Sequence, residues 1–212
     1  MSPLTDFLRL LVITDGSAAC GAGERKNLLN RLDRALDGGA TALMIRERGL
    51  STRELADFSE QVRERTRRRG AWLIVNDRVD IALAVEADAV HLGWQSLDIE
   101  RVRALAGERL RIGYSTHSIE EALACQERGA DYVTFSPVFF TPSKAGLVEV
   151  QGLDGVRRLC GAGGLRIPCV GLGGITPDTA AQVRAQGAAG VAVIRAALDA
   201  PDPAEACRAL RG

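Results

Sequence analysis

Short apolar runs alternate with longer amphipathic stretches along the chain. Eight runs recur: Leu10–Ile13, Ala42–Ile45, Ala71–Val75, Ala89–Leu92, Leu110–Gly113, Tyr132–Phe135, Ile167–Leu172 and Gly190–Ile194. Runs of this length are typical of strands buried on both faces of a parallel sheet, and the stretches between them predict helices. Eight such units in 212 residues predict a closed (β/α)8 TIM barrel, an α/β fold with residues 1–212 forming a single domain.

Helix starts are marked by capping residues. Ser51 and Glu54 have the spacing of a capping box, as do Ser118 and Glu121. Thr176 precedes a proline at the expected first helical position. These signals place helix starts after the second, fifth and seventh apolar runs, which supports the alternation of strand and helix.

Polar residues follow nearly every apolar run. The main groups are Thr14-Asp15, Arg46-Glu47-Arg48, Asn76-Asp77-Arg78, Ser115-Thr116-His117, Gly173-Gly174 and Arg195. In a parallel barrel the carboxyl ends of all strands meet at one face, where the active sites of this fold lie. The sequence therefore predicts an enzyme whose functional residues converge on one mouth.

The composition excludes several other classes. Lys plus Arg and Asp plus Glu both number 27, so no net charge draws the chain to nucleic acid or to an anionic membrane. No apolar stretch reaches the length of a membrane span, and Met1–Phe7 is too polar for a signal peptide. Five cysteines without CxxC spacing argue against a disulfide framework or a zinc site. A reducing, cytoplasmic location is expected.

Two segments predict binding of phosphate. Gly173-Gly174 ends the seventh run, where backbone N–H groups can approach an anion at the start of a helix. Ile194 and Arg195 end the eighth run, and the loops after strands seven and eight form the usual phosphate site of this fold. A tight strand-to-helix turn is the alternative reason for the glycines.

Arg46 and Arg48 are the second candidate for anion binding. Residues two apart in a strand share a face, so both guanidinium groups project together while Glu47 opposes them. Paired guanidinium groups suit a phosphate, a diphosphate or a carboxylate. The alternative is a structural ion pair of one arginine with Glu47, Asp77 or Asp15.

The chain has two histidines. His117 follows the fifth run directly before a helix, where an imidazole can act as a general acid or base near neutral pH or can merely cap the helix. His91 lies inside the fourth run and is expected to be a core residue.

Two further groups lie at the predicted mouth. Asn76 and Asp77 end the third run, and the carboxylate can bind Mg²⁺, hold an arginine or cap the next helix. Thr141, Ser143 and Lys144 lie in the loop after the sixth run, and Lys144 is one of only two lysines. Either Lys144 is a binding group or its place reflects an arginine-rich composition.

The order and spacing of these motifs resemble the thiamine phosphate synthase and thiazole tautomerase superfamily from Leu11 to about Leu198. The matching stretches are Leu11–Asp15, Ile45–Arg48, Val75–Leu83, Val90–Gly93, Ser115–His117, Glu120–Ala122, Gly129–Val133, Gly173–Ile175 and Gly190–Val193. The resemblance implies a TIM barrel that takes small phosphorylated substrates, with a homodimer as the superfamily expectation.

The synthase branch joins a pyrimidine diphosphate to a thiazole phosphate and needs Mg²⁺. Against its motifs, this chain has Met44 for a glutamine, Arg48 for a lysine and Arg195 for a serine. Asp77 matches one magnesium aspartate, but Ser96 stands where a second carboxylate is expected. The alternative is that Asp98, two residues later, supplies this carboxylate. The lost carboxylate argues against synthesis of thiamine phosphate.

The tautomerase branch needs none of the lost groups. It aromatises a dihydrothiazole carboxylate phosphate without a metal or other cofactor, and Ser115–Ser118 matches the setting of its proposed acid/base histidine. The sequence interpretation favours this isomerase, with His117 as the catalytic residue. The resemblance implies substrate binding by Arg46, Arg48, Asn76, Ser115, Thr141, Ser143, Lys144, Gly173, Gly174, Ile194 and Arg195. The alternatives are a divergent synthase with Asp77 on Mg²⁺ and a non-catalytic binder of thiazole or thiamine phosphates.

Overall fold

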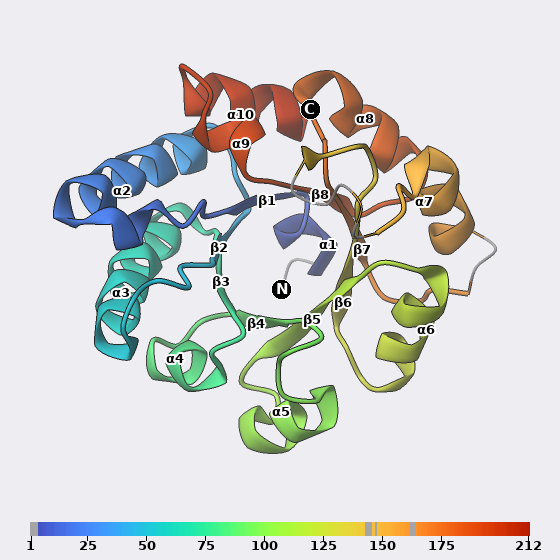
Figure 1. The fold of residues 1–212 in the computed structure, drawn as a ribbon, viewed down its shortest axis with the longest axis horizontal. Helices are drawn as coiled ribbons and strands as arrows, with labels where there is room; N and C mark the ends of the chain where they lie inside the picture. Colours follow the sequence, from blue (N-terminus) through green and yellow to red (C-terminus); the bar gives the residue numbers. More distant parts are fainter. Residues whose placement is uncertain (1–3, 143–145, 147, 162–163) are drawn as a thin grey trace.

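The strands close into one parallel barrel (Figure 1). The computed structural model describes residues 4–142, 146, 148–161 and 164–212. Its strands are β1 (Leu10–Ile13), β2 (Ala42–Ile45), β3 (Trp72–Asn76), β4 (Ala89–Leu92), β5 (Arg111–Thr116), β6 (Tyr132–Phe135), β7 (Cys169–Leu172) and β8 (Gly190–Val193). Each strand pairs with the next in parallel, and β8 pairs with β1. The predicted (β/α)8 barrel is confirmed, whereas the extent of the domain, residues 1–212, stays a prediction.

Helices surround the barrel on its outside (Figure 1). They are α1 (Leu4–Phe7), the 3-10 helix η1 (Ser17–Cys20), α2 (Ala22–Asp37), α3 (Thr52–Arg69), α4 (Val79–Ala84), α5 (Ile99–Ala106), α6 (Ile119–Glu127), α7 (Gly152–Cys160), α8 (Pro177–Ala185), α9 (Arg195–Leu198) and α10 (Pro203–Arg211). α1 is the exception, since it lies at the centre of the ring. Within the described part of the chain, no helix is long and apolar enough to cross a membrane.

The capping signals are confirmed. Ser51 and Glu54 form a reciprocal capping box at the start of α3. The Ser118 hydroxyl accepts the Glu121 N–H at the start of α6, and Thr176 caps α8 with Pro177 at the first helical position. Each cap satisfies backbone N–H groups that have no partner inside the helix. Their helices therefore begin where the site loops end.

The bounds of β3, β5, β7 and β8 differ from the predicted runs, and the differences at β5 and β7 are the largest. β5 continues to Thr116, so Ser115 lies inside a strand instead of after it. β7 begins at Cys169 and not at Ile167, because Pro168 has no N–H to donate to the barrel ladder. The longer β5 fixes Ser115 by strand pairing, which restricts its position more than a loop would.

The core has two parts. One lies between the barrel and its helices, and the other fills the barrel with side chains that include Leu11, Met44 and Tyr132. Phe7 of α1 stacks on Trp72 at the start of β3, with ring centroids 4.7 Å apart. α1 therefore lies against the amino-terminal end of the barrel, and the opposite end carries the mouth.

Candidate active site

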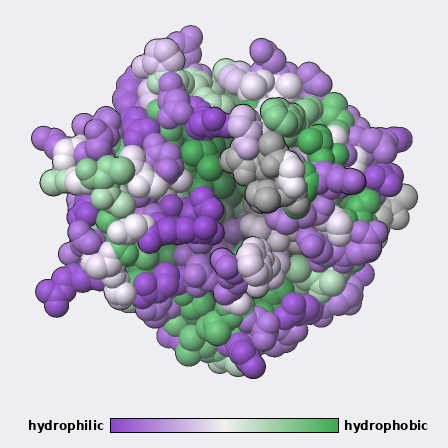
Figure 2. Space-filling view, in the orientation of Figure 1, coloured by the Kyte–Doolittle hydropathy of each residue, from purple (hydrophilic) through white to green (hydrophobic). Residues whose placement is uncertain are grey.

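The mouth holds two adjoining cavities at the carboxyl ends of the strands. The first, here called the arginine lobe, has a volume of about 480 Å³ and contains Arg48, Asp77 and Ser96. The second, here called the glycine lobe, has a volume of about 810 Å³ and contains Gly173, Gly174 and Arg195. Both are lined by Arg46, Asn76, Ser115 and His117. Figure 2 shows this face hollowed near its centre, with hydrophobic surface inside the hollow and hydrophilic residues around it.

Arg46 and Arg48 supply the positive charge of the arginine lobe. Within the described residues no carboxylate forms an ion pair with either side chain, so the structural ion pair considered above is not formed. Burial, and then the charge of Arg48, lowers the pKa of the Arg46 guanidinium. Two uncompensated guanidinium groups held together are costly without a bound anion. The lobe is therefore built for a multiply charged anion.

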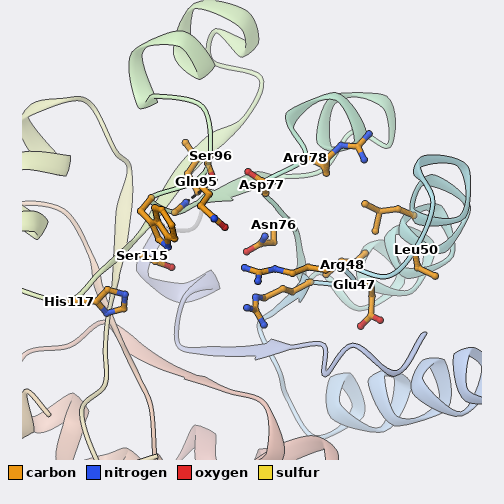
Figure 3. A pocket seen from close by; sticks show the side chains of 16 residues that line it. Glu47, Arg48, Leu50, Asn76, Asp77, Arg78, Gln95, Ser96, Ser115 and His117 are labelled. Atoms are coloured by element: carbon orange, nitrogen blue, oxygen red, sulfur yellow. Dashed lines mark hydrogen bonds between the residues drawn. The ribbon is translucent and has the colours of Figure 1, made fainter. Parts of the chain in front are cut away.

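Glu47 is occupied elsewhere. Its carboxylate is buried and accepts the backbone N–H groups of Gly16 and Ala18, at 3.0 Å each. Figure 3 shows Glu47 pointing away from the space that Arg48, Asn76 and Gln95 approach. Burial raises the pKa of Glu47 despite these hydrogen bonds. The residue holds the loop after β1 against the end of β2, which fixes the direction of the arginines.

Asp77 is the exposed carboxylate of the arginine lobe. It has a positive φ of 65°, a conformation that costs energy in a residue with a side chain. Its backbone N–H donates to the His91 carbonyl oxygen at 2.9 Å, which holds this conformation. The neighbouring Arg78 is paired with Asp80 and points away in Figure 3. The Asp77 carboxylate is thus available at the mouth.

The oxygen atoms around Asp77 fit a magnesium ion that is shared with a ligand. Gln95 and Ser96 line the same lobe and supply amide and hydroxyl oxygens. Mg²⁺ usually binds through one or two carboxylates, with substrate phosphates and waters completing its octahedron. Among the described residues no group of three His, Cys, Asp or Glu side chains could hold a metal by itself. The protein groups therefore fit the ion only together with an anionic ligand.

Asp98 does not replace the missing carboxylate. It precedes α5 and pairs with Arg128 at 3.4 Å and with Arg101 at 3.7 Å. It lines neither lobe. Because Asp98 lies two residues after the expected position, its side chain contacts arginines of the outer helices and not the site around Asp77.

His117 lies at the junction of the two lobes. Its Nδ1 is 2.7 Å from the Ser136 carbonyl oxygen, which can only accept, so Nδ1 carries the hydrogen. Its backbone N–H donates to Glu121 at 2.6 Å. The structure places His117 at the mouth as predicted, and its catalytic role stays a prediction.

The glycine lobe joins a backbone surface to a cation. Gly173 and Gly174 have positive φ values of 103° and 64°. A Cβ atom at Gly174 would lie 2.6 Å from the Phe140 carbonyl oxygen, so the close approach requires glycine. Arg195 donates to the Thr141 hydroxyl at 3.4 Å, and Ile194 lines the same lobe.

Most predicted substrate-binding residues come together at this mouth. They are Arg46, Arg48, Asn76, Ser115, Thr141, Gly173, Gly174, Ile194 and Arg195. Ser143 and Lys144 lie outside the described residues. The role of each residue in binding stays a prediction.

Sequence reasoning did not predict two polar side chains inside the barrel that line the glycine lobe, His91 and Thr134. His91 is buried as predicted, yet its ring also borders the cavity. A signal was present in β6, since Tyr132 and Thr134 lie two apart and therefore face the same side of the strand. Polar groups repeated on the inner face of a barrel strand indicate a network inside it.

Comparisons with known proteins agree on one family. The family model described as thiamine monophosphate synthase matches residues 10–197. The thiamine-phosphate synthase of Moorella thermoacetica is 47% identical over 84% of this chain and 83% of its own length. The bifunctional protein ThiM/ThiE of Symbiobacterium thermophilum is 43% identical over 98% of this chain, which spans 41% of that protein.

A solved structure gives the same result. Thiamine phosphate pyrophosphorylase from Pyrococcus furiosus superposes with a TM-score of 0.87 at 38% identity, covering 99% of this chain and 96% of that one. The expected thiazole tautomerase is therefore wrong, because these relatives are named as synthases or as the pyrophosphorylase. The resemblance to the superfamily and the assignment to an enzyme of thiamine biosynthesis are confirmed. This chain belongs to the thiamine monophosphate synthase family.

Proposed function

We propose that this chain is a thiamine-phosphate synthase, which joins a pyrimidine diphosphate to a thiazole phosphate. One observation carries the proposal: two cavities suited to anions adjoin each other and share the side chains of Arg46, Asn76, Ser115 and His117. The phosphate and the carboxylate of a dihydrothiazole substrate belong to one small molecule. A synthase must hold two phosphorylated substrates with their reacting atoms close together.

The arginine lobe would hold the diphosphate. Arg46 and Arg48 can each form bidentate hydrogen bonds with phosphate oxygens, and the amide of Asn76 lies beside them. Asp77, with Ser96 and Gln95 in the same lobe, would hold Mg²⁺ together with diphosphate oxygens. A bound Mg²⁺ would neutralise charge that develops on the departing diphosphate.

The glycine lobe would hold the thiazole phosphate. The N–H groups around Gly173 and Gly174 precede α8, whose N-terminus favours an anion, and Arg195 adds a full positive charge. Apolar side chains also line this lobe, among them Met44 and Leu172. They suit an aromatic ring placed between the phosphate and the junction.

The reaction transfers no proton at the thiazole ring. A nitrogen–carbon bond forms as the carbon–oxygen bond to the diphosphate breaks, and the electron pair of that bond leaves with the diphosphate. Arg46 and Arg48 would stabilise the charge on the leaving group. The two lobes would align the thiazole nitrogen with the carbon that carries the diphosphate. The reaction between two molecules then becomes a reaction within one complex.

The direct test is product formation from the two substrates. We expect the wild-type protein to form thiamine phosphate in millimolar Mg²⁺ and to lose this activity with a chelator. Asp77→Asn should need more Mg²⁺ for half-maximal rate, since its amide oxygen carries no negative charge. Binding of both substrates without product would instead favour the non-catalytic binder and would refute the proposed function.

A further inference from the structure

Three neighbouring strands bring a buried hydrogen-bonded chain to the edge of the mouth. His91 on β4 lies 3.1 Å from the Tyr132 hydroxyl on β6 through Nδ1, and 3.0 Å from the Ser115 hydroxyl on β5 through Nε2. Tyr132 is fully buried and His91 is 3% exposed. Ser115 lines both lobes. The chain therefore connects the barrel interior to the junction where the two substrates would meet.

A glycine makes this connection sterically feasible. Gly113 pairs with His91 on one side and with Tyr132 on the other. A Cβ atom at Gly113 would lie 2.1 Å from Cζ of the Tyr132 ring. The tyrosine can thus cross over β5 to reach the imidazole only because β5 has no side chain there.

The direction of the hydrogen bonds follows from satisfying each buried proton. Both rings are buried, which favours the neutral phenol and the neutral imidazole. Within the described residues the Tyr132 hydroxyl has no hydrogen-bond partner other than His91. If Nδ1–H donated to the phenol oxygen, the phenol proton would be buried without an acceptor, which is costly. Tyr132 therefore donates to Nδ1.

This direction determines what Ser115 can do. With Nδ1 accepting, the single hydrogen of the neutral ring is on Nε2 and is donated to the Ser115 oxygen, while Thr134 lies farther away at 3.4 Å. The serine oxygen is then an acceptor toward the core. Its own proton is left to be donated toward the cavity.

We propose that Tyr132 and His91 are positioning residues that make Ser115 a hydrogen-bond donor toward an anionic oxygen at the junction of the two lobes. Arg46 and Asn76 line both lobes as Ser115 does, so the recognised group is a diphosphate oxygen. This choice of ligand rests on the proposed function. Tyr132 and His91 act on the ligand only through Ser115. His91 therefore has a role in binding beyond the packing that the sequence predicted for it.

The tautomer of His91 gives a test that needs no ligand. The chain has only two histidines, so the His117→Asn variant leaves one imidazole for ¹⁵N NMR. We expect the lone pair on Nδ1 and the hydrogen on Nε2. A hydrogen on Nδ1 would overturn the proposal, because Ser115 would then donate to His91 and not to the cavity.

Binding of inorganic diphosphate with Mg²⁺ tests the coupling. Ser115→Ala should weaken binding about ten- to hundredfold, the effect of losing a hydrogen bond to a charged group. Tyr132→Phe should weaken it about three- to tenfold, because a neutral buried hydrogen bond contributes less. The double variant should bind no more weakly than Ser115→Ala alone.

Thr116→Val is the matched control. The Thr116 hydroxyl is buried next to Ser115 but donates to the Thr134 carbonyl and lines neither lobe. Its loss should lower thermal stability without changing diphosphate affinity. Additive losses in the double variant would refute the positioning role of Tyr132 and His91 and would leave the proposed function unaffected. A wild-type protein that binds diphosphate with Mg²⁺ but makes no thiamine phosphate would refute the proposed function alone.

Discussion

At the scale of single residues, the charge of the mouth is unbalanced in favour of anions. Arg46 and Arg48 have no ion-pair partner among the described residues, and Asp77 is the exposed carboxylate beside them. Ser96 occupies the position where the sequence comparison leads one to expect a second carboxylate. Its hydroxyl accepts the Gly93 N–H at 2.9 Å, which fixes the loop after β4 in the lobe.

The Ser96→Asp substitution tests whether one carboxylate limits metal binding. A second negative charge beside Asp77 should lower the Mg²⁺ concentration needed for half-maximal rate by about tenfold. Titration of activity with Mg²⁺ measures this value, with Ser96→Asn as the uncharged control of similar size. An equal Mg²⁺ requirement in all three proteins would place the metal away from Ser96.

The His117→Asn substitution separates bond formation from proton transfer. General acid–base catalysis by a histidine contributes about 10²–10⁴-fold, whereas the synthase step transfers no proton at the thiazole ring. We therefore expect the turnover number of thiamine phosphate formation to fall by less than about tenfold, which is below the lower end of that range. Steady-state kinetics checks this expectation, and a fall of a thousandfold would show that a proton transfer had been overlooked.

At the scale of elements, strand register determines which interior groups meet. Gly113 on β5 lies between His91 and Tyr132 across two strand pairings, and the absence of a side chain leaves room for the tyrosine ring. The close packing of barrel interiors permits little relaxation around an added methyl group. One position on β5 thus affects both stability and the orientation of Ser115.

The Gly113→Ala substitution should therefore destabilise the barrel. The added Cβ would contact the Tyr132 ring, and overpacking of this kind costs about 1–3 kcal/mol. Gly23→Ala in α2 is the control, because a Cβ there has no neighbour within 4 Å and alanine favours a helix. Chemical denaturation of both variants measures the difference. Equal stability of the two would show that Tyr132 can move aside without cost.

Strand and helix positions were largely predictable from the sequence, but the interior network was not. Apolar runs such as Ala42–Ile45 are buried on both faces, so their pattern alone marks them as barrel strands. The contact of His91 with Ser115 depends on the register between β4 and β5, which apolar runs do not encode.

The choice of enzyme was wrong for a different reason. The serine at position 96 was interpreted as the loss of the magnesium site. One carboxylate can nevertheless bind Mg²⁺ when diphosphate oxygens and waters complete the coordination shell. The two cavities could not be predicted from the sequence. Their separation depends on the positions of Asn76 and Ser115 at the junction, which emerge only when the barrel closes.

At the scale of the whole molecule, the mouth divides into two lobes with different chemistry. Arg46 lines both lobes, whereas Arg195 lines only the glycine lobe, beside Thr141. If each lobe takes one substrate, each arginine should affect mainly one Michaelis constant. The loss of one charge-assisted contact corresponds to about a ten- to hundredfold change.

Steady-state kinetics of thiamine phosphate formation by the wild type, Arg46→Ala and Arg195→Ala tests this division most directly. We predict that Arg46→Ala raises the KM for the pyrimidine diphosphate and that Arg195→Ala raises the KM for the thiazole phosphate, each by about ten- to hundredfold. The other KM should change by less than about threefold in each variant. The account would be contradicted if the wild type made no thiamine phosphate, or if both variants raised the KM for the same substrate.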